Sequence, residues 1–295
     1  MTPQKKATVV SSSVAAVLTL IKLAIGITSG SVAVLASAVD SILDMFVSIF
    51  NYFAISNSEK PADRTFNYGR GKIEALASVI EGTIISISGL FLLYQAAKKA
   101  INNEASQYLE ISIYVMIISL IITILLVIYL SYIAKKTNSM VIKADALHYK
   151  TDVFSNAAVL ISLLLVTFTG YEIIDVIVGG GIALYIIYSA YSLIQEGILV
   201  LLDRAVDEEV VSNIEEIIKQ NDKVNTYHLL KTREAANQTF VEVHLVFNCL
   251  ITLMEAHKAS DSIENKIKKL DSRRDWIINI HMDPYDDFKV NDTNH

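Results

Sequence analysis

Six long apolar segments fill roughly the first two thirds of this chain and restrict its fold more than any other feature. A helix needs about 20 mainly apolar residues to cross the hydrocarbon core of a bilayer, and each segment is near or above that length. The segments cover residues 8–29, 32–55, 74–97, 109–133, 144–168 and 173–201. We therefore expect residues 1–203 to form a membrane α-helical bundle of six transmembrane helices in a lipid bilayer.

The basic residues that flank these segments predict the orientation of the bundle. Cytoplasmic ends of transmembrane helices carry an excess of Lys and Arg. One side of the predicted bundle has only Lys98 and Lys99. The other side has Lys5, Lys6, Lys60, Arg64, Arg70, Lys72, Lys135, Lys136 and Lys143. We expect a multi-pass protein of the cell inner (cytoplasmic) membrane with both termini in the cytoplasm.

Composition excludes several classes of protein. The chain is 53% hydrophobic and 19% charged, which is too apolar for an ordinary soluble protein. Its net charge of −6 argues against a nucleic-acid partner. A single cysteine, Cys249, rules out a disulfide within the chain. The N-terminus MTPQKKATVV leads into an apolar segment without a convincing cleavage motif, so we expect no cleaved signal peptide.

The composition changes after Leu202, where charged residues become frequent. EEVVSNIEEIIKQ and residues 252–270 have the apolar spacing of amphipathic helices, whereas TYHLLKTRE, QTFVEVHLVF and DWIINIHMDP resemble strands. The order αββαβ predicts a three-stranded sheet with two helices on one face. We expect residues 204–288 to form a small cytoplasmic α+β domain and residues 289–295 to be a disordered tail.

Two pairs of ionisable residues interrupt the apolar segments at the same spacing. Asp40 and Asp44 are four residues apart, as are His148 and Asp152, so each pair lies on one face of its helix. A charged residue within lipid costs at least about 2.5 kcal/mol. Two crossing helices that each present two ligands can make a tetrahedral site, and oxygen and nitrogen ligands suit Zn²⁺ and its divalent neighbours. The alternative, polar groups that only pack helices together or lie near the membrane interface, explains two matched pairs less well.

Other buried ionisable residues are harder to assign from their positions. Asp145 precedes His148 by three residues, so it either supports the predicted site or lies at its cytoplasmic mouth. Glu81 in the third segment is either a proton-carrying group or a structural partner within the bundle, and we favour the structural role. Asp and His must lose their protons to bind a metal. A site open to each side of the membrane in turn would therefore exchange a cation for one or more protons.

The histidines gather in the charged part of the chain. His228 and His244 lie on two predicted strands, His257 is early in the second predicted helix, and His281 is on the third strand with Asp283 two residues later. Side chains two residues apart on a strand point to the same face. A sheet can bring these residues together, so we expect a second cluster of metal ligands there, in preference to scattered surface histidines.

These motifs resemble the cation diffusion facilitator family, specifically its bacterial zinc/iron-type branch. The resemblance covers nearly the whole chain and rests on DSILD, YGRGKIEAL, HYKTD, LLDRAVDEE and HMDP. It implies a homodimer of six-helix protomers with a metallochaperone-like cytoplasmic domain, which exports divalent cations in exchange for protons. The implied transport site is Asp40, Asp44, His148 and Asp152. The implied cytoplasmic binuclear site is His228, His244, His257, His281 and Asp283.

The resemblance also implies a salt bridge between Lys72 and Asp203 that stabilises the dimer, and a hydrophobic gate at Leu147. The chain departs from the family in the loop PADRTFNYGRGK. Zinc members often carry a further site there, built from an Asp and two His. Asp63 matches, but Phe66 and Arg70 occupy the two histidine positions, so we expect this site to be absent.

The imidazole of His148 favours Zn²⁺ as the metal, both transported and regulatory, with Cd²⁺ and Fe²⁺ as alternatives. A site made only of carboxylates would have suggested Mn²⁺, and an exporter of the same family whose physiological metal is Fe²⁺ or Mn²⁺ is kept as an alternative. Two other functions are considered: a membrane-bound metal sensor or scaffold without turnover, and an intramembrane metalloenzyme. The chain has no HExxH-like pair with a general base, which counts against an enzyme.

Overall fold

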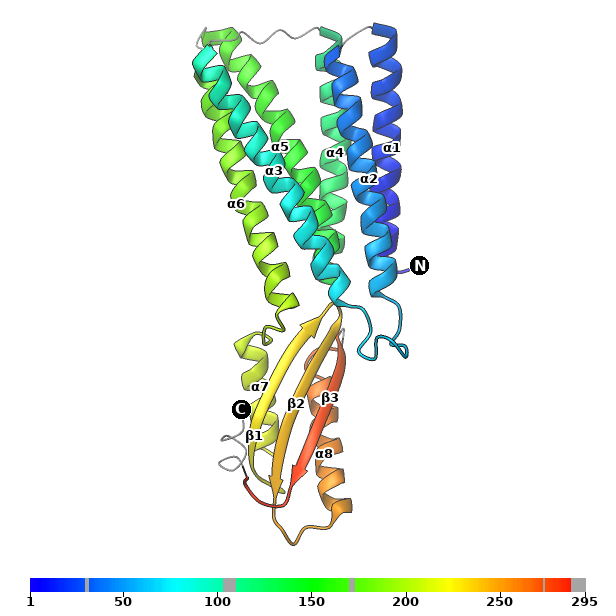
Figure 1. Ribbon diagram of the computed structural model, residues 1–295, viewed down its shortest axis with the longest axis vertical. Helices are drawn as coiled ribbons and strands as arrows, with labels where there is room; N and C mark the ends of the chain where they lie inside the picture. The colour runs from blue at the N-terminus through cyan, green and yellow to red at the C-terminus, as the bar shows by residue number, and fades with distance from the viewer. Residues whose placement is uncertain (30–31, 103–109, 170–172, 273, 288–295) are drawn as a thin grey trace. The chain divides into compact units, whose positions relative to one another are not determined.

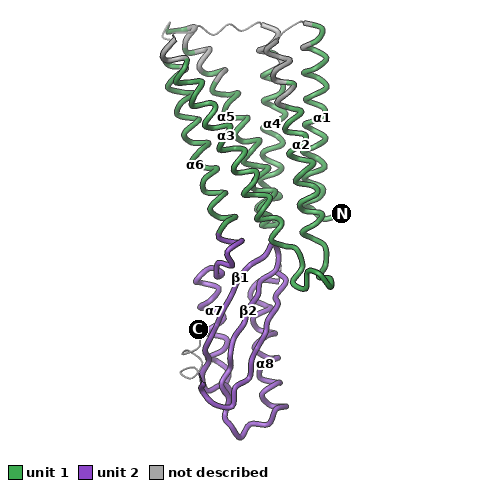
Figure 2. The backbone as a smooth tube through the Cα atoms, in the orientation of Figure 1, with its two compact units in different colours: residues 1–198 green, residues 199–295 purple. Residues whose placement is uncertain are grey.

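The computed structural model describes residues 1–29, 32–102, 110–169, 173–272 and 274–287 (Figure 1). Contacts divide the chain into two compact units, residues 1–198 and 199–295 (Figure 2). The predicted boundary after residue 203 lies a few residues beyond this division. The predicted tail, residues 289–295, lies outside the described residues, as do some side chains within the helices, including that of Asp40.

The first unit consists of long helices, and all six predicted helices are present. They are α1 (Pro3–Ser29), α2 (Val32–Ser58), α3 (Lys72–Asn102), α4 (Glu110–Thr137), α5 (Met140–Thr169) and α6 (Ile173–Leu201). α1, α3, α4 and α6 contain spans long and apolar enough to cross a membrane. α2 and α5 are not among these four. Both carry the ionisable pairs found in the sequence, and both have side chains outside the described residues.

Side chains on the outside of the bundle are large and apolar, as expected for contact with lipid. Exposed examples on successive helices are Leu20, Phe46, Ile87, Leu125 and Tyr188. The interior contains polar groups as well as apolar ones. Ser48, Asn51, Glu81 and Asp145 are each at most 1% exposed. The bundle is therefore apolar on its surface and locally polar at its centre.

Small residues allow α3 and α6 to approach closely. Gly82 and Gly89 on α3 face the backbone oxygens of Ala190 and Ala183 on α6, and Gly197 on α6 faces that of Ala75 on α3. On each helix these small residues recur every seven positions, so they form one continuous seam. Small residues at such seams are how transmembrane helices pack backbone against backbone.

Gly197→Ala is expected to loosen this seam, because the added Cβ would lie 2.6 Å from Val79 Cγ2 and 3.0 Å from the backbone oxygen of Ala75. Overpacking of this kind typically costs about 1–3 kcal/mol. Gly180→Ala on the same helix is the matched control, since its Cβ would meet nothing within 4 Å. Thermal unfolding in detergent should show a lower Tm for Gly197→Ala and no loss for Gly180→Ala. Equal Tm values for the two variants would contradict the packing argument.

The second unit is an α+β domain with the predicted order of elements. It contains α7 (Glu208–Lys219), β1 (Val224–Ala235), β2 (Gln238–Phe247), α8 (Leu253–Lys268) and β3 (Asp275–Asp283). The strand order is β1-β2-β3, with β1 antiparallel and β3 parallel to β2 (Figure 1). A parallel pair needs a crossover connection, and α8 supplies it.

Both helices of this domain pack on one face of the sheet, as predicted. The core contains Ile214 and Ile218 from α7 and Ile263 and Ile267 from α8. Alternate residues of the strands complete it: Val241, Val243, Leu245 and Phe247 from β2, and Trp276, Ile278, Ile280 and Met282 from β3. The intervening residues of β2 and β3 therefore point to the face opposite the two helices, and these include His244, His281 and Asp283.

Candidate metal sites

Three of the four predicted intramembrane ligands converge in the structure. Asp44 on α2 and His148 and Asp152 on α5 each offer a ligand atom, and these atoms all lie within 4.8 Å of one another. The Nε2 atom of His148 is 3.1 Å from Oδ1 of Asp44, and the two side chains are 12% and 20% exposed. The spacing of four residues places the two α5 groups on one face, directed at α2. Asp40 lies on α2 one turn before Asp44, but its side chain is outside the described residues.

Two neighbours of this group on α5, Lys150 and Leu147, contact residues of α6. The Nζ atom of Lys150 donates to the Tyr185 hydroxyl at 3.0 Å and lies 5.4 Å from the centre of the Phe154 ring. Leu147, the predicted gate residue, packs against an apolar cluster of α3, α5 and α6 that includes Ile85 and Ile186. Two carboxylates and an imidazole in a partly buried position suit a divalent cation.

A second group of buried polar side chains lies beside the first, and its membership was not predicted from sequence. The Nδ2 atom of Asn51 donates to Glu81 Oε2 at 3.0 Å and to Asp145 Oδ1 at 3.3 Å. The Ser48 hydroxyl is 2.9 Å from that of Tyr149 and 3.5 Å from Asp145 Oδ1. Asp145 and Glu81 were considered separately in the sequence. Only the three-dimensional structure shows that both accept hydrogen bonds from Asn51.

Three histidines form a row across the face of the sheet opposite α7 and α8. His228 on β1 is paired in register with His244 on β2, which is paired with His281 on β3. The ring centres are 4.9 Å apart between His228 and His244 and 4.5 Å apart between His244 and His281. Directly opposite residues on neighbouring strands come into side-chain contact. The register therefore gathers predicted ligands from three separate stretches of sequence.

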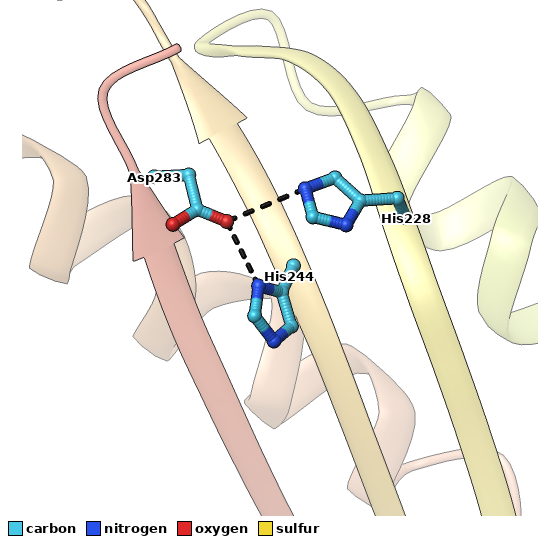
Figure 3. A group of neighbouring side chains, drawn as sticks. All are labelled: His228, His244 and Asp283. Atoms are coloured by element: carbon cyan, nitrogen blue, oxygen red, sulfur yellow. Dashed lines mark hydrogen bonds and ion pairs between the residues drawn. The ribbon is translucent and has the colours of Figure 1, made fainter. Parts of the chain in front are cut away.

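Asp283 joins the three rings. Its Oδ2 atom is 2.9 Å from Nδ1 of His244 and 3.4 Å from Nε2 of His228 (Figure 3). Its other oxygen, Oδ1, is 3.0 Å from Nε2 of His281. Asp283 and His228 are each 7% exposed, whereas His281 is 64% exposed. The donor set fits a zinc-like ion, since His and carboxylate are common ligands of Zn²⁺.

A β-bulge places His228 in this row. The register of β1 shifts between His228 and Lys231, and Leu229 adopts a positive φ of 50°. Without the extra residue, Leu229 would lie opposite His244 and the His228 side chain would point into the core. A leucine in this left-handed conformation is uncommon, and nothing in the local sequence predicted the bulge.

His257 is not part of the row within one protomer. It lies on α8, is 61% exposed, and its Nε2 atom is 3.6 Å from Asp261 Oδ2. An apolar pocket beside it is lined by Leu253, Met254 and Met282. The expectation that one sheet gathers all the histidines is therefore not met in a single chain, because α8 covers the opposite face. A role for His257 as a ligand stays a prediction for the assembled protein.

Asp287 is a neighbour of the row that the sequence did not reveal. Its Oδ1 atom lies 3.4 Å from Nε2 of His228, and its side chain is 25% exposed. In the sequence it stands among the polar residues that lead into the tail, which carry no strand or helix pattern. It adds a second carboxylate to the buried end of the row.

The loop between α2 and α3 contains an ion pair between two of its own residues, Asp63 and Arg70. Oδ1 of Asp63 accepts from the backbone N–H groups of Thr65 and Phe66, and its Oδ2 is 2.5 Å from Arg70 Nη2. The N–H groups of Phe66 and Thr65 hold the pKa of Asp63 below its usual range. The Arg70 guanidinium also lies 4.5 Å from the centre of the Phe66 ring. The loop thus uses the two residues that stand in place of histidines for an ion pair and a cation–π contact.

Asp203 has a partner within the second unit. Its Oδ1 atom accepts a hydrogen bond from Arg233 Nη1 at 3.2 Å. Lys72, the predicted partner, begins α3 in the first unit. The predicted salt bridge between Lys72 and Asp203 therefore stays a prediction.

Two family models together match almost the whole chain. The cation efflux transmembrane domain matches residues 8–202, and the cytoplasmic domain of cation efflux proteins matches residues 206–285. The first of these covers all six long helices, including α2 and α5, apart from a few residues at the start of α1.

Curated relatives match over nearly their full length. The cation-efflux pump FieF of Escherichia fergusonii is 34% identical over 279 residues, covering 95% of this chain and 92% of that protein. The FieF pumps of Pectobacterium atrosepticum and Yersinia pestis are also 34% identical, over 278 and 280 residues, and cover 94% and 95% of this chain and 92% of each relative.

Solved structures of the MamM CTD match a shorter part of the chain. A cadmium form is 15% identical, covers 27% of this chain and 98% of its own, and has a TM-score of 0.25. A nickel form is 14% identical and covers 27% of this chain and 100% of its own, with the same TM-score.

Proposed function

The chain belongs to the cation diffusion facilitator family of cation efflux proteins, and on this premise we propose that it exports Zn²⁺ from the cytoplasm in exchange for protons. One observation carries the proposal. Asp44, His148 and Asp152 converge inside a membrane bundle, with ligand atoms within 4.8 Å of one another. Asp40 is proposed as the fourth ligand, because it precedes Asp44 by one helical turn.

The choice of zinc rests on the mixed ligand set. Imidazole suits Zn²⁺ and its transition-metal neighbours, whereas sites made only of carboxylate, carbonyl and water suit Mg²⁺, Ca²⁺ and Mn²⁺. The described group lacks thiolates, which argues against Cu⁺. Cd²⁺ and Fe²⁺ remain alternative cargoes, and Mn²⁺ is the least compatible with His148.

Proton exchange follows from the chemistry of the same groups. A carboxylate or an imidazole must be deprotonated to bind a metal, so protons and Zn²⁺ compete for one site. Unperturbed histidine titrates near pH 6.5, within the range of cellular pH. Transport of this kind makes and breaks no covalent bond, so we propose a transporter and not an enzyme. We also propose that both termini lie in the cytoplasm, and the distribution of Lys and Arg supports this orientation.

The cytoplasmic domain is proposed to bind regulatory Zn²⁺ through His228, His244, His281 and Asp283. The protein is proposed to act as a homodimer, in which His257 and the apolar pocket beside it face a second copy. Metal bound between two cytoplasmic domains would favour one arrangement of the dimer over another. The same row of histidines also supports the alternative function, a membrane-bound metal sensor without turnover.

Flux through proteoliposomes tests the proposal. Purified full-length chain is reconstituted with a zinc-sensitive dye and a pH dye in the lumen. An acidic lumen should drive Zn²⁺ inward while the luminal pH rises, and a protonophore should stop the accumulation. Cd²⁺, Fe²⁺ and Mn²⁺ are offered in competition. Zinc flux that ignores the pH gradient would contradict antiport, and the absence of any metal flux would favour the sensor.

A further inference from the structure

Glu81, Asn51 and Asp145 form a buried cluster that has more acceptors than donors. They come from α3, α2 and α5, and they are 1%, 0% and 0% exposed. The two hydrogens of the Asn51 amide serve one oxygen of each carboxylate. Glu81 Oε1, Asp145 Oδ2 and Asn51 Oδ1 are buried and receive no hydrogen bond. Buried polar atoms are normally satisfied, so this cluster lacks a positive or hydrogen-donating ligand.

Two ionised carboxylates that share one amide donor would repel each other in a low-dielectric interior. Binding one proton removes a charge and supplies the missing donor. Two carboxyl groups in this situation titrate as a pair, not as independent groups. The Asn51 amide directs its positive end toward both carboxylates, which disfavours a metal ion at the same oxygens.

The cluster lies about one helical turn from the metal group. On α2, Ser48 follows Asp44 by four residues and bridges toward Asp145 and Tyr149. On α5, Asp145 precedes His148 by three residues, so both lie on neighbouring faces of the same helix. The cluster is displaced from the metal group toward the ends where α2 stops and α3 and α5 start. Those ends carry the basic residues that predict the cytoplasmic side.

Titratable groups of α5 and a hydroxyl group of α1 act on the cluster. His148 of α5 interacts electrostatically with both Glu81 and Asp145. Tyr149 of α5 interacts with Asp145, and also with Asp44 of α2 and Asp152 of α5. From α1, the Ser11 hydroxyl lies within hydrogen-bonding reach of Asp145. The same hydroxyl donates to the backbone oxygen of Thr8 at 3.1 Å. The cluster and the metal group therefore share one electrostatic environment.

We propose that Glu81 and Asp145 are a proton-binding pair that holds one proton while the metal site is empty and releases it when a divalent cation binds. The inference rests on the proposed antiport and adds a proton site outside the metal ligands. When M²⁺ enters at Asp44, His148 and Asp152, the O–H bond of the protonated carboxyl breaks and the proton passes to water. The bundle then gains one positive charge instead of two. When the metal leaves, the carboxylate takes up a proton again.

Glu74 provides a matched control on the same helix. It is also buried, at 5% exposed, but both of its oxygens accept hydrogen bonds, from Ser58 at 3.2 Å and from Ser139 at 2.6 Å. Glu74 is therefore buried like Glu81, but neither of its carboxylate oxygens lacks a hydrogen-bond donor. Glu81→Gln and Glu74→Gln change the same chemical group by one atom, and Glu81→Gln supplies a permanent donor where the proton is proposed to lie.

The experiment counts the protons released as full-length protein in detergent binds Zn²⁺. Calorimetry in buffers of different ionisation enthalpy gives this number, and luminal pH in proteoliposomes gives the protons moved per zinc. Glu81→Gln should release about one proton fewer per protomer than the unmodified chain, because the pair titrates as a unit. Asp145→Asn makes the same test from α5 if Glu81→Gln fails to fold. Glu74→Gln should release the unchanged number.

An unchanged number in both Glu81→Gln and Asp145→Asn, with coupled transport in the unmodified chain, would overturn the proton pair and leave the antiport intact. Zinc binding by the unmodified chain without any proton release would overturn the antiport and the pair together. An equal loss in Glu74→Gln would show that any buried carboxylate has this effect, and would also overturn the assignment.

Discussion

Asp152→Asn is expected to abolish zinc transport by the full-length chain while leaving its fold intact. The substitution keeps the shape of the side chain but removes the charge and one acceptor oxygen from the group formed with Asp44 and His148. Loss of a supporting residue outside the ligand shell already costs about 10–100-fold in metal affinity, so loss of a ligand should cost at least about 100-fold. Asp44→Asn should have the same effect from α2.

The measurement is initial Zn²⁺ uptake into proteoliposomes with an acidic lumen, together with zinc affinity in detergent. Asp63→Asn is the control, because Asp63 is paired with Arg70 in an exposed loop and takes no part in the bundle. Size-exclusion profiles and Tm should show that all three variants are folded. Uptake within about twofold of the unmodified chain in Asp152→Asn would place the transport site elsewhere, since a factor of two is under 0.5 kcal/mol.

The helices and strands were predictable because each has a strong local pattern. Long apolar runs indicated α1 to α6, and alternation indicated β1 to β3. α5 was predictable in spite of Asp145, His148 and Asp152, since a long apolar run follows them. Helix spacing also predicted that His148 and Asp152 share a face, and the structure brings them to Asp44. The prediction of a shared face required only the period of the helix, and the prediction of a bound cation required only the cost of placing charge in lipid.

Other parts of the candidate sites depend on contacts between distant residues. The row of three histidines requires the register of three strands, and His228 enters it only through the bulge at Leu229. The proximity of Asn51 to Glu81 and Asp145 depends on the rotation of three helices about their axes. Hydropathy and spacing do not determine either quantity. His257 was grouped with the other histidines by residue type, but its helix packs on the opposite face of the sheet.

Asp283→Asn is expected to remove the zinc site of the cytoplasmic domain, because Asp283 contacts all three histidines of the row. The test uses chains that also carry Asp152→Asn, so that the membrane site does not contribute to binding. Zinc affinity measured by calorimetry should fall by at least about 100-fold on loss of this ligand. Zinc at 100 times its Kd stabilises a folded state by about 2.7 kcal/mol, so the zinc-dependent rise in the Tm of this domain should disappear as well.

Two further variants in the Asp152→Asn background test whether the loss is specific to Asp283 and whether the site is shared between two protomers. Asp222→Asn changes an exposed carboxylate of the same domain and should leave zinc binding unchanged. His257→Ala lies outside the row within one chain, so it should weaken binding only if a second protomer brings its His257 to the metal. A loss with His257→Ala that appears in the dimer and not in a dilute monomer would assign that histidine to a shared site. Full zinc affinity in Asp283→Asn would contradict the prediction. It would show that the histidines bind the metal without the Asp283 carboxylate.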